Sequence, residues 1–449
     1  MRIMIIGAGN AGRYLATKLS AERHDIVVID RDDAALREIQ SRVDVGTLLG
    51  DGCDPAVLEE AMVSKADLVV AVTDRDEVNI LACALANLAG VKNKVARVAH
   101  AHVYRDSPNY DLKRLGIDLA VSQKEECAEE IYHILRIPGT LEAVDMMEGR
   151  AIVVGIKVHM DSPLIFQTLK SFPRQDLVNR IRFIAVNRNE ELLLPDGNTQ
   201  FMIGDDVFFV ATPTAVHEFL TWAHPEHTEF EKVVIAGGGS LGLQLARMLE
   251  SENMNVVLIE RDELRAEVCA GRLDDTLVIQ GDALDRDIFQ TVEIVKGTAV
   301  VAATGDDETN IMICLLAEKS GAIFTLAQVA KPDYVPIINS LSLLDRAVSS
   351  HMSMINSILH FVRGKNITAV ATLQKLPGEL LEVCIPPSHK WVGQSIRDIR
   401  LPTGMIIAIV SRDGTVVPAV GDLVFESGDQ VVLYAVPKAV AKVPSIFKG

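Results

Sequence analysis

Two glycine-rich segments have the residue types and spacing needed to bind the phosphates of a nucleotide. Each lies between an apolar run and a segment of helical periodicity. In such a loop the first glycine allows a tight turn and the second lets the backbone approach a pyrophosphate at the positive end of the following helix. The third lets helix and strand pack closely. The expected loop residues are Gly7, Ala8, Gly9, Asn10, Ala11 and Gly12 in the first copy, and Gly237, Gly238, Gly239, Ser240, Leu241 and Gly242 in the second.

An acidic residue follows each loop at the same distance. Asp30 lies 23 residues after Gly7, and Glu260 lies 23 residues after Gly237. Each ends a short apolar run, a position from which a carboxylate accepts hydrogen bonds from ribose hydroxyls. An acid here favours NAD over NADP, and ATP or ADP stays compatible because it also has a free 2′-hydroxyl. The sequence therefore predicts two adenine-nucleotide sites, and the alternative is a pair of similar modules that have lost their ligand.

Further candidate residues follow the other apolar runs, because open α/β sheets bind ligands beyond the carboxyl ends of their strands. The acid after the third run is expected to face the adenosine or to cap the next helix. The residues after the fourth run would line the crevice above the pyrophosphate, and the arginine after the fifth would face a phosphate. These candidates are Asp51, Thr73, Asp74 and Arg97 in the first copy, and Asp282 and Thr304 in the second, where Gly305 and Gln328 replace Asp74 and Arg97.

The two loops differ directly after their third glycine. Arg13 stands there in the first copy and Leu243 in the second. A cation at this point could reach an additional terminal phosphate. This leads to the hypothesis that the first site accepts ATP or ADP as well as NAD-type ligands, whereas the second prefers dinucleotides. The alternative is that Arg13 pairs with a nearby acid.

The loops belong to a tandem duplication of the chain. Residues 3–36 align with residues 233–266 without gaps, and the segment GDDVFFVATPTAV at 204–216 matches GDQVVLYAVPKAV at 428–440. Internal repeats of this length imply that each half carries the same modules in the same order. The polar stretch 221–231, which contains a proline, is expected to be the junction between the halves.

The pattern of apolar runs predicts an α/β fold with two tandem Rossmann-like modules, each followed by a crossover helix and a small α+β domain. Six runs alternate with helical segments in each larger module, which is typical of a parallel sheet covered on both faces. The tails contain alternating strands, such as RAIVVGIKV and RIRFIAVNR, and one short helix. The expected boundaries are 1–123, 124–138 and 139–225 in the first half, and 230–348, 349–364 and 365–449 in the second. Each crossover helix is expected to pack on a partner module through an apolar stripe, comprising Ile131, Ile134 and Leu135 in the first, and Ile355, Ile358, Leu359 and Phe361 in the second.

The composition argues against several classes of function. A formal net charge of −17 over 449 residues argues against nucleic-acid binding and against adsorption to anionic lipid. No apolar run is long enough to span a bilayer, and the six scattered cysteines argue against a disulfide scaffold or a structural zinc site. These features predict a cytoplasmic protein.

Catalytic and metal-binding residues are not expected. His100 and His102 could serve catalysis or bind a metal, but Ala330 and Pro332 stand at the matching positions of the second half. The two histidines are therefore interpreted as loop or interface residues, and no catalytic or metal residue is assigned. A duplicated nucleotide fold without duplicated catalysis predicts a sensor rather than an enzyme. The alternatives are an NAD-dependent oxidoreductase and a scaffold with vestigial nucleotide sites.

The ordered combination of glycine loops, Gly-Asp steps, T-x-x-D-E-x-N segments and small β-rich tails resembles the RCK (regulator of potassium conductance) family over essentially the whole chain. The duplicated arrangement is similar to the cytoplasmic regulatory subunits of bacterial Trk potassium-uptake systems. The resemblance implies binding of NAD(H) and ATP/ADP, a tetrameric ring, and attachment at the inner face of the membrane to a TrkH/TrkG-type channel subunit without insertion into the bilayer. Family nucleotide-binding positions match Gly7 to Ala11, Asp30, Thr73, Asp74 and Arg97, and in the second half Gly237 to Leu241, Glu260 and Thr304; Gly305 and Gln328 depart from the pattern.

Overall fold

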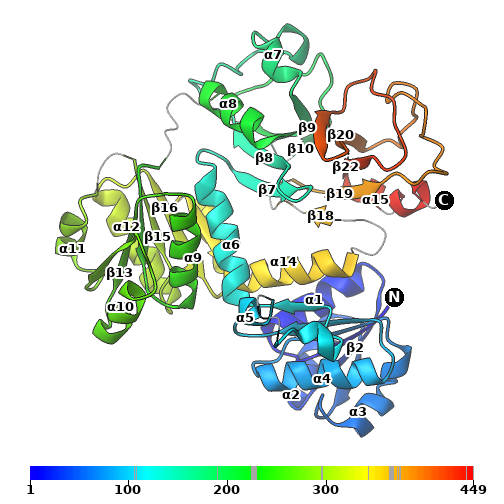
Figure 1. Ribbon diagram of the computed structural model, residues 1–449, viewed down its shortest axis with the longest axis vertical. Helices are drawn as coiled ribbons and strands as arrows, with labels where there is room; N and C mark the ends of the chain where they lie inside the picture. Colours follow the sequence, from blue (N-terminus) through cyan, green and yellow to red (C-terminus); the bar gives the residue numbers. More distant parts are fainter. Residues whose placement is uncertain are drawn as a thin grey trace. The chain divides into compact units, whose positions relative to one another are not determined.

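The computed structural model of the chain (Figure 1) forms two compact units, one made of Met1–Tyr132 and Phe230–Val362 and the other of His133–Glu229 and Arg363–Gly449. The structure describes residues 1–105, 107, 109–189, 191–223, 230–294, 297–341, 343–363, 369–371, 373, 376–440 and 442–447. Residues 224–229 of the expected junction and residues 364–368 near the last expected boundary lie outside the described residues. No helix in the described part of the chain has the length and apolar character needed to cross a membrane.

The first Rossmann-like module contains a six-stranded parallel sheet in the order β3-β2-β1-β4-β5-β6. All six apolar runs form strands, as predicted. Alternate side chains of β1 enter two different cores, Ile3 and Ile5 on one face and Met4 and Ile6 on the other, which is why the run is continuously apolar. Its elements are β1 (Arg2–Ile6), α1 (Asn10–Ala21), β2 (Asp25–Asp30), α2 (Asp33–Arg42), β3 (Gly46–Leu49), α3 (Pro55–Glu60), β4 (Leu68–Ala71), α4 (Asp76–Leu88), β5 (Asn93–Arg97), α5 (Ala101–Arg105) and β6 (Leu119–Val121).

The second module repeats this topology with the order β14-β13-β12-β15-β16-β17. In each module the strand order reverses beside the first strand, so the glycine loop opens at the switch point where such sheets bind ligands. Its elements are β12 (Lys232–Ala236), α9 (Ser240–Ser251), β13 (Val256–Glu260), α10 (Glu263–Ala270), β14 (Leu277–Gln280), α11 (Arg286–Thr291), β15 (Thr298–Ala302), α12 (Asp307–Lys319), β16 (Phe324–Val329), α13 (Tyr334–Leu341) and β17 (Arg346–Ser349).

The two modules exchange contacts through their crossover helices, α6 (Gln123–Arg136) and α14 (Ser350–Arg363). The apolar stripe of α14 enters the core of the first module, where Ile355, Ile358 and Leu359 pack with strand β1 and helix α1. Helix α6 reaches the second module, because the hydroxyl of Tyr132 donates to Oε1 of Glu252, beyond the end of α9, at 2.7 Å. The packing of the α14 stripe on the opposite module is therefore confirmed.

The other unit contains two antiparallel sheets of five strands, in the orders β10-β9-β11-β8-β7 and β18-β19-β22-β20-β21. The strands are β7 (Glu142–Met146), β8 (Ala151–Lys157), β9 (Ile181–Arg188), β10 (Glu191–Leu193), β11 (Asp206–Ala211), β18 (Ala369–Ala371), β19 (Glu379–Cys384), β20 (Met405–Arg412), β21 (Thr415–Pro418) and β22 (Gln430–Ala435). The helices are α7 (Gln175–Val178) and α8 (Pro213–Ala223) in the first domain, and α15 (Pro437–Val440) and α16 (Val443–Ile446) in the second. The prediction of one short helix was wrong for the first tail, because α8 spans 11 residues and follows α7.

The central strands of the small domains, such as β8, β11, β20 and β22, are buried on both faces rather than alternating between buried and exposed. In β8, Val154 and Ile156 pack into the core of their own domain, whereas Ala151 and Val153 pack with Ile409 of the second domain. The expectation of alternating strands was wrong because the two sheets cover each other. The sequence of one small domain does not contain this information.

Candidate functional site

Each Rossmann-like module has a cleft at the carboxyl ends of its strands. The first cleft has a volume of about 400 Å³ and is lined by Gly7, Gly9, Asp30, Asp51, Thr73 and Arg97, among others. The second has a volume of about 630 Å³ and is lined by Gly237, Gly239, Glu260, Asp282, Thr304 and Gln328, among others. The structure therefore brings the loop, acid and strand-end residues predicted from the sequence together in both halves.

The three glycines of the first loop have different structural roles. Gly7 has a φ of 112°, a left-handed conformation that favours glycine. A Cβ atom on Gly12 would lie 1.8 Å from the carbonyl oxygen of Gly7, so α1 can pack against the turn only through a hydrogen atom. Gly9 precedes the first residue of α1, has a φ of −65°, and would meet no atom within 4 Å if it carried a Cβ. The space beside Gly9 is thus open to a phosphate.

The geometry that the two glycine loops share depends on the acid at the end of the second strand of each module. The backbone N–H of Ala8 donates to Oδ2 of Asp30 at 2.5 Å, and that of Gly238 donates to Oε2 of Glu260 at 2.7 Å. The other carboxylate oxygen of each acid accepts the N–H two residues further along the chain, at 2.9 and 2.8 Å. Each acid therefore holds the glycine loop to the second strand, and it also lines the cleft, where a carboxylate oxygen can accept further hydrogen bonds.

The acids after the third strand form local turns. Oδ1 of Asp51 accepts the backbone N–H of Cys53 at 2.9 Å, and Asp282 accepts that of Leu284 at 2.9 Å. The hydrogen bond from Cys53 and the pairing with Arg31 lower the pKa of Asp51. The next helix of the first module is capped by Asp54 rather than by Asp51, so Asp51 lines the cleft without capping a helix.

A buried asparagine in each module fixes the threonine at the end of the fourth strand. Asn79 is fully buried; its Oδ1 accepts the N–H of Thr73 at 2.9 Å and the hydroxyl at 2.7 Å, and its Nδ2 donates to the carbonyl of Arg97 at 2.9 Å. Asn310 makes the same contacts with Thr304 and Gln328. The asparagine therefore joins the fourth and fifth strands at the floor of the cleft. Each asparagine is the last residue of a T-x-x-D-E-x-N segment, but the repeat of that segment alone did not indicate this role.

Each cleft also contains residues from the opposite half of the chain. His351, at the start of α14, lines the first cleft, and Lys124, at the start of α6, lines the second together with Gln123. The imidazole Nδ1 of His351 donates to the carbonyl of Ala330 at 2.8 Å, which leaves Nε2 as the nitrogen that can contact a ligand. Lys124 and His351 were not predicted from the sequence as cleft residues. The two residues occupy the same position in the two crossover helices, which could have pointed to a shared role. Nothing in the sequence indicated which cleft each residue enters.

The charges of the two clefts come from different positions. Arg13 is not among the described residues that line the first cleft; its guanidinium donates to Asn10 at 2.6 Å and pairs with Glu38. This placement corresponds to the local ion pair considered above as the alternative. The first cleft is lined by equal numbers of basic and acidic residues: Arg31, Arg75 and Arg97, and Asp30, Asp51 and Asp74. The second cleft is lined by three basic residues, Lys124, Arg261 and Arg265, and by four acidic ones, Glu260, Asp282, Asp306 and Asp307.

Models of two protein domains match the chain twice each. The TrkA-N domain matches residues 3–123 and 233–350, and the TrkA-C domain matches residues 153–224 and 380–448. Among solved structures, the chain superposes on one described as the GsuK RCK domain with a TM-score of 0.62 and 19% identity, covering 99% of this chain and 94% of the other. A structure described as the GsuK channel bound to NAD gives a TM-score of 0.62 and 19% identity over 99% of this chain and 78% of that one. The fold thus defines a tandem RCK-type chain.

Full-length relatives narrow this class further. The chain is 33% identical over 442 residues to the Trk system potassium uptake protein TrkA of Halomonas elongata, covering 98% of this chain and 96% of that protein. It is 31% identical over 454 residues to the protein of the same name from Vibrio alginolyticus, covering 100% and 99%. The chain belongs to the TrkA family.

Proposed function

We propose that this protein is the nucleotide-sensing regulatory subunit of a potassium-uptake system, which binds NAD(H) and ATP or ADP in its two clefts and gates a TrkH-type membrane subunit. The observation that carries the proposal is the duplicated loop, in which the space beside Gly9 and Gly239 is open and no side chain caps the helix that follows. The binding residues proposed from the sequence line these clefts, apart from Arg13 and a few loop residues behind them. Relatives named for potassium uptake and a similar fold described as NAD-bound support this function.

The mechanism that we propose is thermodynamic linkage. A nucleotide shifts the channel only if it binds two conformations of the regulatory subunit with different affinities. The exchange of crossover helices provides a route, because residues of both halves line each cleft and a ligand would therefore stabilise one arrangement of the two modules. In the cell we expect a tetrameric ring of this chain on the inner face of the membrane, with each ring contacting the channel subunit.

The direct test is calorimetric titration of the full-length protein with ATP, ADP, NAD and NADH. We expect saturable binding of adenine nucleotides and no turnover of NADH. Absence of binding by all four would overturn the proposal and favour a scaffold. Oxidation of NADH with a small substrate would favour the oxidoreductase.

We expect Lys124→Ala to weaken nucleotide binding in the second cleft by about tenfold. Loss of a charge-assisted hydrogen bond to phosphate costs about 1.5–3 kcal/mol, and 1.4 kcal/mol corresponds to a factor of ten. Arg13→Ala is the matched control, since it also removes one cation but from a side chain that pairs with Glu38. It should leave affinity unchanged within about twofold. Titrations of both variants check this, and a larger loss in Arg13→Ala than in Lys124→Ala would show that the phosphates lie elsewhere.

We expect binding of ATP in the first cleft to tighten as the pH falls, through His351. Burial lowers the pKa of His351 below its ordinary value; Arg97 acts in the same direction, and the hydrogen bond to Ala330 and the charge of Asp307 act against it. His351 is therefore neutral in the empty protein at neutral pH. A bound phosphate would favour the protonated form, so binding takes up a proton and affinity rises by about fivefold from pH 8 to pH 6. The same titration with His351→Gln gives the pH dependence of ATP itself, and identical curves for the two proteins would contradict the prediction.

A further inference from the structure

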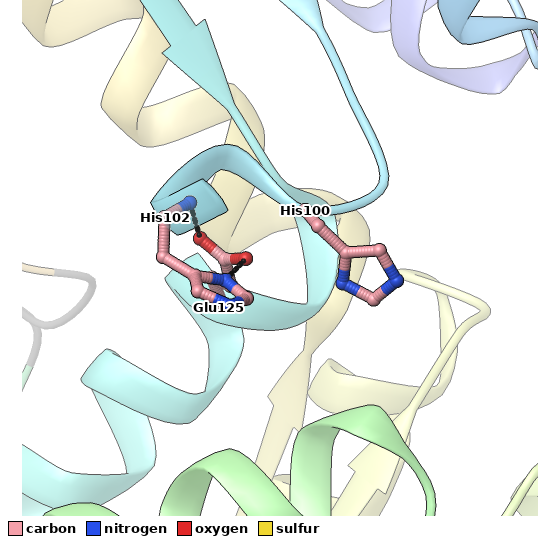
Figure 2. A group of neighbouring side chains, drawn as sticks. All are labelled: His100, His102 and Glu125. Atoms are coloured by element: carbon pink, nitrogen blue, oxygen red, sulfur yellow. Dashed lines mark hydrogen bonds and ion pairs between the residues drawn. The ribbon is translucent and has the colours of Figure 1, made fainter. Parts of the chain in front are cut away.

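Three potential metal ligands lie close together in the first module outside the nucleotide cleft, with His102 and Glu125 in contact and the ring of His100 beside them (Figure 2). His100 lies in the loop after β5, His102 lies in α5, and Glu125 lies in the first turn of α6. One ligand atom from each lies within 4.8 Å of the other two. Oε1 of Glu125 lies 2.5 Å from Nδ1 of His102, and the rings of the two histidines meet edge-on with their centroids 5.9 Å apart. Two imidazoles and a carboxylate form a ligand set that suits zinc and similar divalent ions.

The second half of the chain shows that the fold does not need this cluster. The positions that match His100 and His102 carry Lys331 and Asp333, because Ala330 is the counterpart of Ala99, and Met352 matches Glu125 in the crossover helix. The match of the two histidines with Ala330 and Pro332 expected from the sequence was therefore wrong by one residue. In both halves the loop after the fifth strand is held by another acid: Asp76 accepts the N–H of Ala99 at 2.8 Å, and Asp307 accepts that of Ala330 at 2.7 Å. The cluster is therefore an addition to the first half rather than part of the shared framework.

The environment of Glu125 favours a cation at this point. The residue is 7% exposed, and its carboxylate contacts the ring and the backbone N–H of His102. A buried carboxylate is costly unless a positive charge or several donors compensate it. His100 is exposed and lies in the loop after β5, so its ring can turn toward the other two. An entry path for an ion from solvent is therefore present.

We propose that His100, His102 and Glu125 bind a divalent transition-metal ion of the zinc class, with water as the fourth ligand. The ion replaces the proton shared between Glu125 and His102, and that proton passes to solvent. Metal–ligand distances are about 2.0–2.2 Å, which puts tetrahedral ligands about 3.4 Å apart. Binding therefore requires the Glu125–His102 contact to open by about 1 Å and the ring of His100 to approach, and both movements involve side chains alone.

The position of the proposed metal site, between elements that line the two nucleotide clefts, suggests that metal binding affects both clefts. The ion would join the loop after β5 to α6, and β5 ends at Arg97 in the first cleft, whereas Lys124, next to Glu125, lines the second. Metal binding would thus fix the start of the crossover helix that enters the opposite cleft. The binding step itself involves no nucleotide, so it is tested separately from the proposed function.

The test is equilibrium dialysis of the full-length protein against zinc chloride without nucleotide. Cys384 is exposed, and an exposed thiolate can bind zinc on its own, so all proteins carry Cys384→Ser. We expect one tight site per chain, and we expect His100→Ala and Glu125→Gln each to weaken it at least tenfold. His217→Ala, which removes an exposed histidine from the other unit, is the matched control and should bind zinc as the parent does.

Circular dichroism establishes that each variant is folded, and His100→Ala removes an exposed side chain, so it tests the site even if Glu125→Gln unfolds. Equal zinc affinity in His100→Ala and the parent would overturn the proposal. Zinc binding that disappears with the Cys384→Ser change alone would overturn it as well. A cobalt(II) complex whose visible absorption is lost in His100→Ala would support it independently.

Discussion

Replacing both Gly9 and Gly239 with alanine should abolish nucleotide binding and leave the stability of the protein unchanged. A Cβ on either residue would meet no protein atom within 4 Å, and both have a φ that alanine adopts readily, −65° and −66°. The added methyl group would instead occupy the space through which a pyrophosphate reaches the helix N-terminus. We expect the affinity for ATP and NAD to fall at least a hundredfold, or about 2.7 kcal/mol, in calorimetric titration.

The matched controls are the two single substitutions, each of which should remove binding in one cleft and keep it in the other. Thermal unfolding of all three variants without nucleotide should stay within about 0.5 kcal/mol of the parent. In cells, potassium uptake should lose its nucleotide control in the double variant. Normal affinity in that variant, with intact folding, would mean that phosphates do not bind at these loops.

Replacing Gly12 with alanine should have the opposite effect and destabilise the fold itself. Its Cβ would lie 1.8 Å from the oxygen and 2.9 Å from the carbon of the Gly7 carbonyl, and these are backbone atoms that cannot turn aside. Helix α1 would have to move away from β1, although Leu15 and Leu19 on that helix are completely buried. We expect a loss of at least about 4 kcal/mol in the free energy of unfolding, measured by urea denaturation, which is at the extreme of single substitutions.

Gly242→Ala provides an independent copy of this test, because its Cβ would lie 1.9 Å from the carbonyl oxygen of Gly237. Gly90→Ala is the control for the replacement of glycine in general, since Gly90 follows α4 with a φ of 86° but has no atom within 4 Å of a Cβ. It should cost only about 1 kcal/mol for its backbone strain. Comparable losses for Gly12→Ala and Gly90→Ala would show that close packing of the helix on the turn is not decisive.

The sequence predicted most of the parallel-sheet modules because their strands are buried on both faces. The runs RIMII and KVVIA became β1 and β12, and the glycine spacing placed both turns correctly. Local patterns also located Asp30 and Glu260, whose contacts with the loop span about one βαβ unit.

The features that the sequence did not predict depend on contacts between distant segments. Lys124 and His351 enter clefts formed by residues more than a hundred positions away, so no local pattern indicates their role. Arg13 follows the third glycine, but it pairs with Glu38 of the neighbouring helix. The face-to-face packing that buries β8 likewise involves residues of the other half, such as Ile409.

The exchange of α6 and α14 has a consequence for dissecting this protein. The core that receives Ile355, Ile358 and Leu359 is built from residues 1–132, so an isolated first half would expose that apolar surface to water. An isolated half of the chain contains its own crossover helix, which is equivalent to the one that it lacks. Two such halves can therefore cover the exposed surface by exchanging these helices in a symmetric dimer. An isolated half is therefore expected to form a homodimer that reproduces the arrangement of the two modules in the full chain.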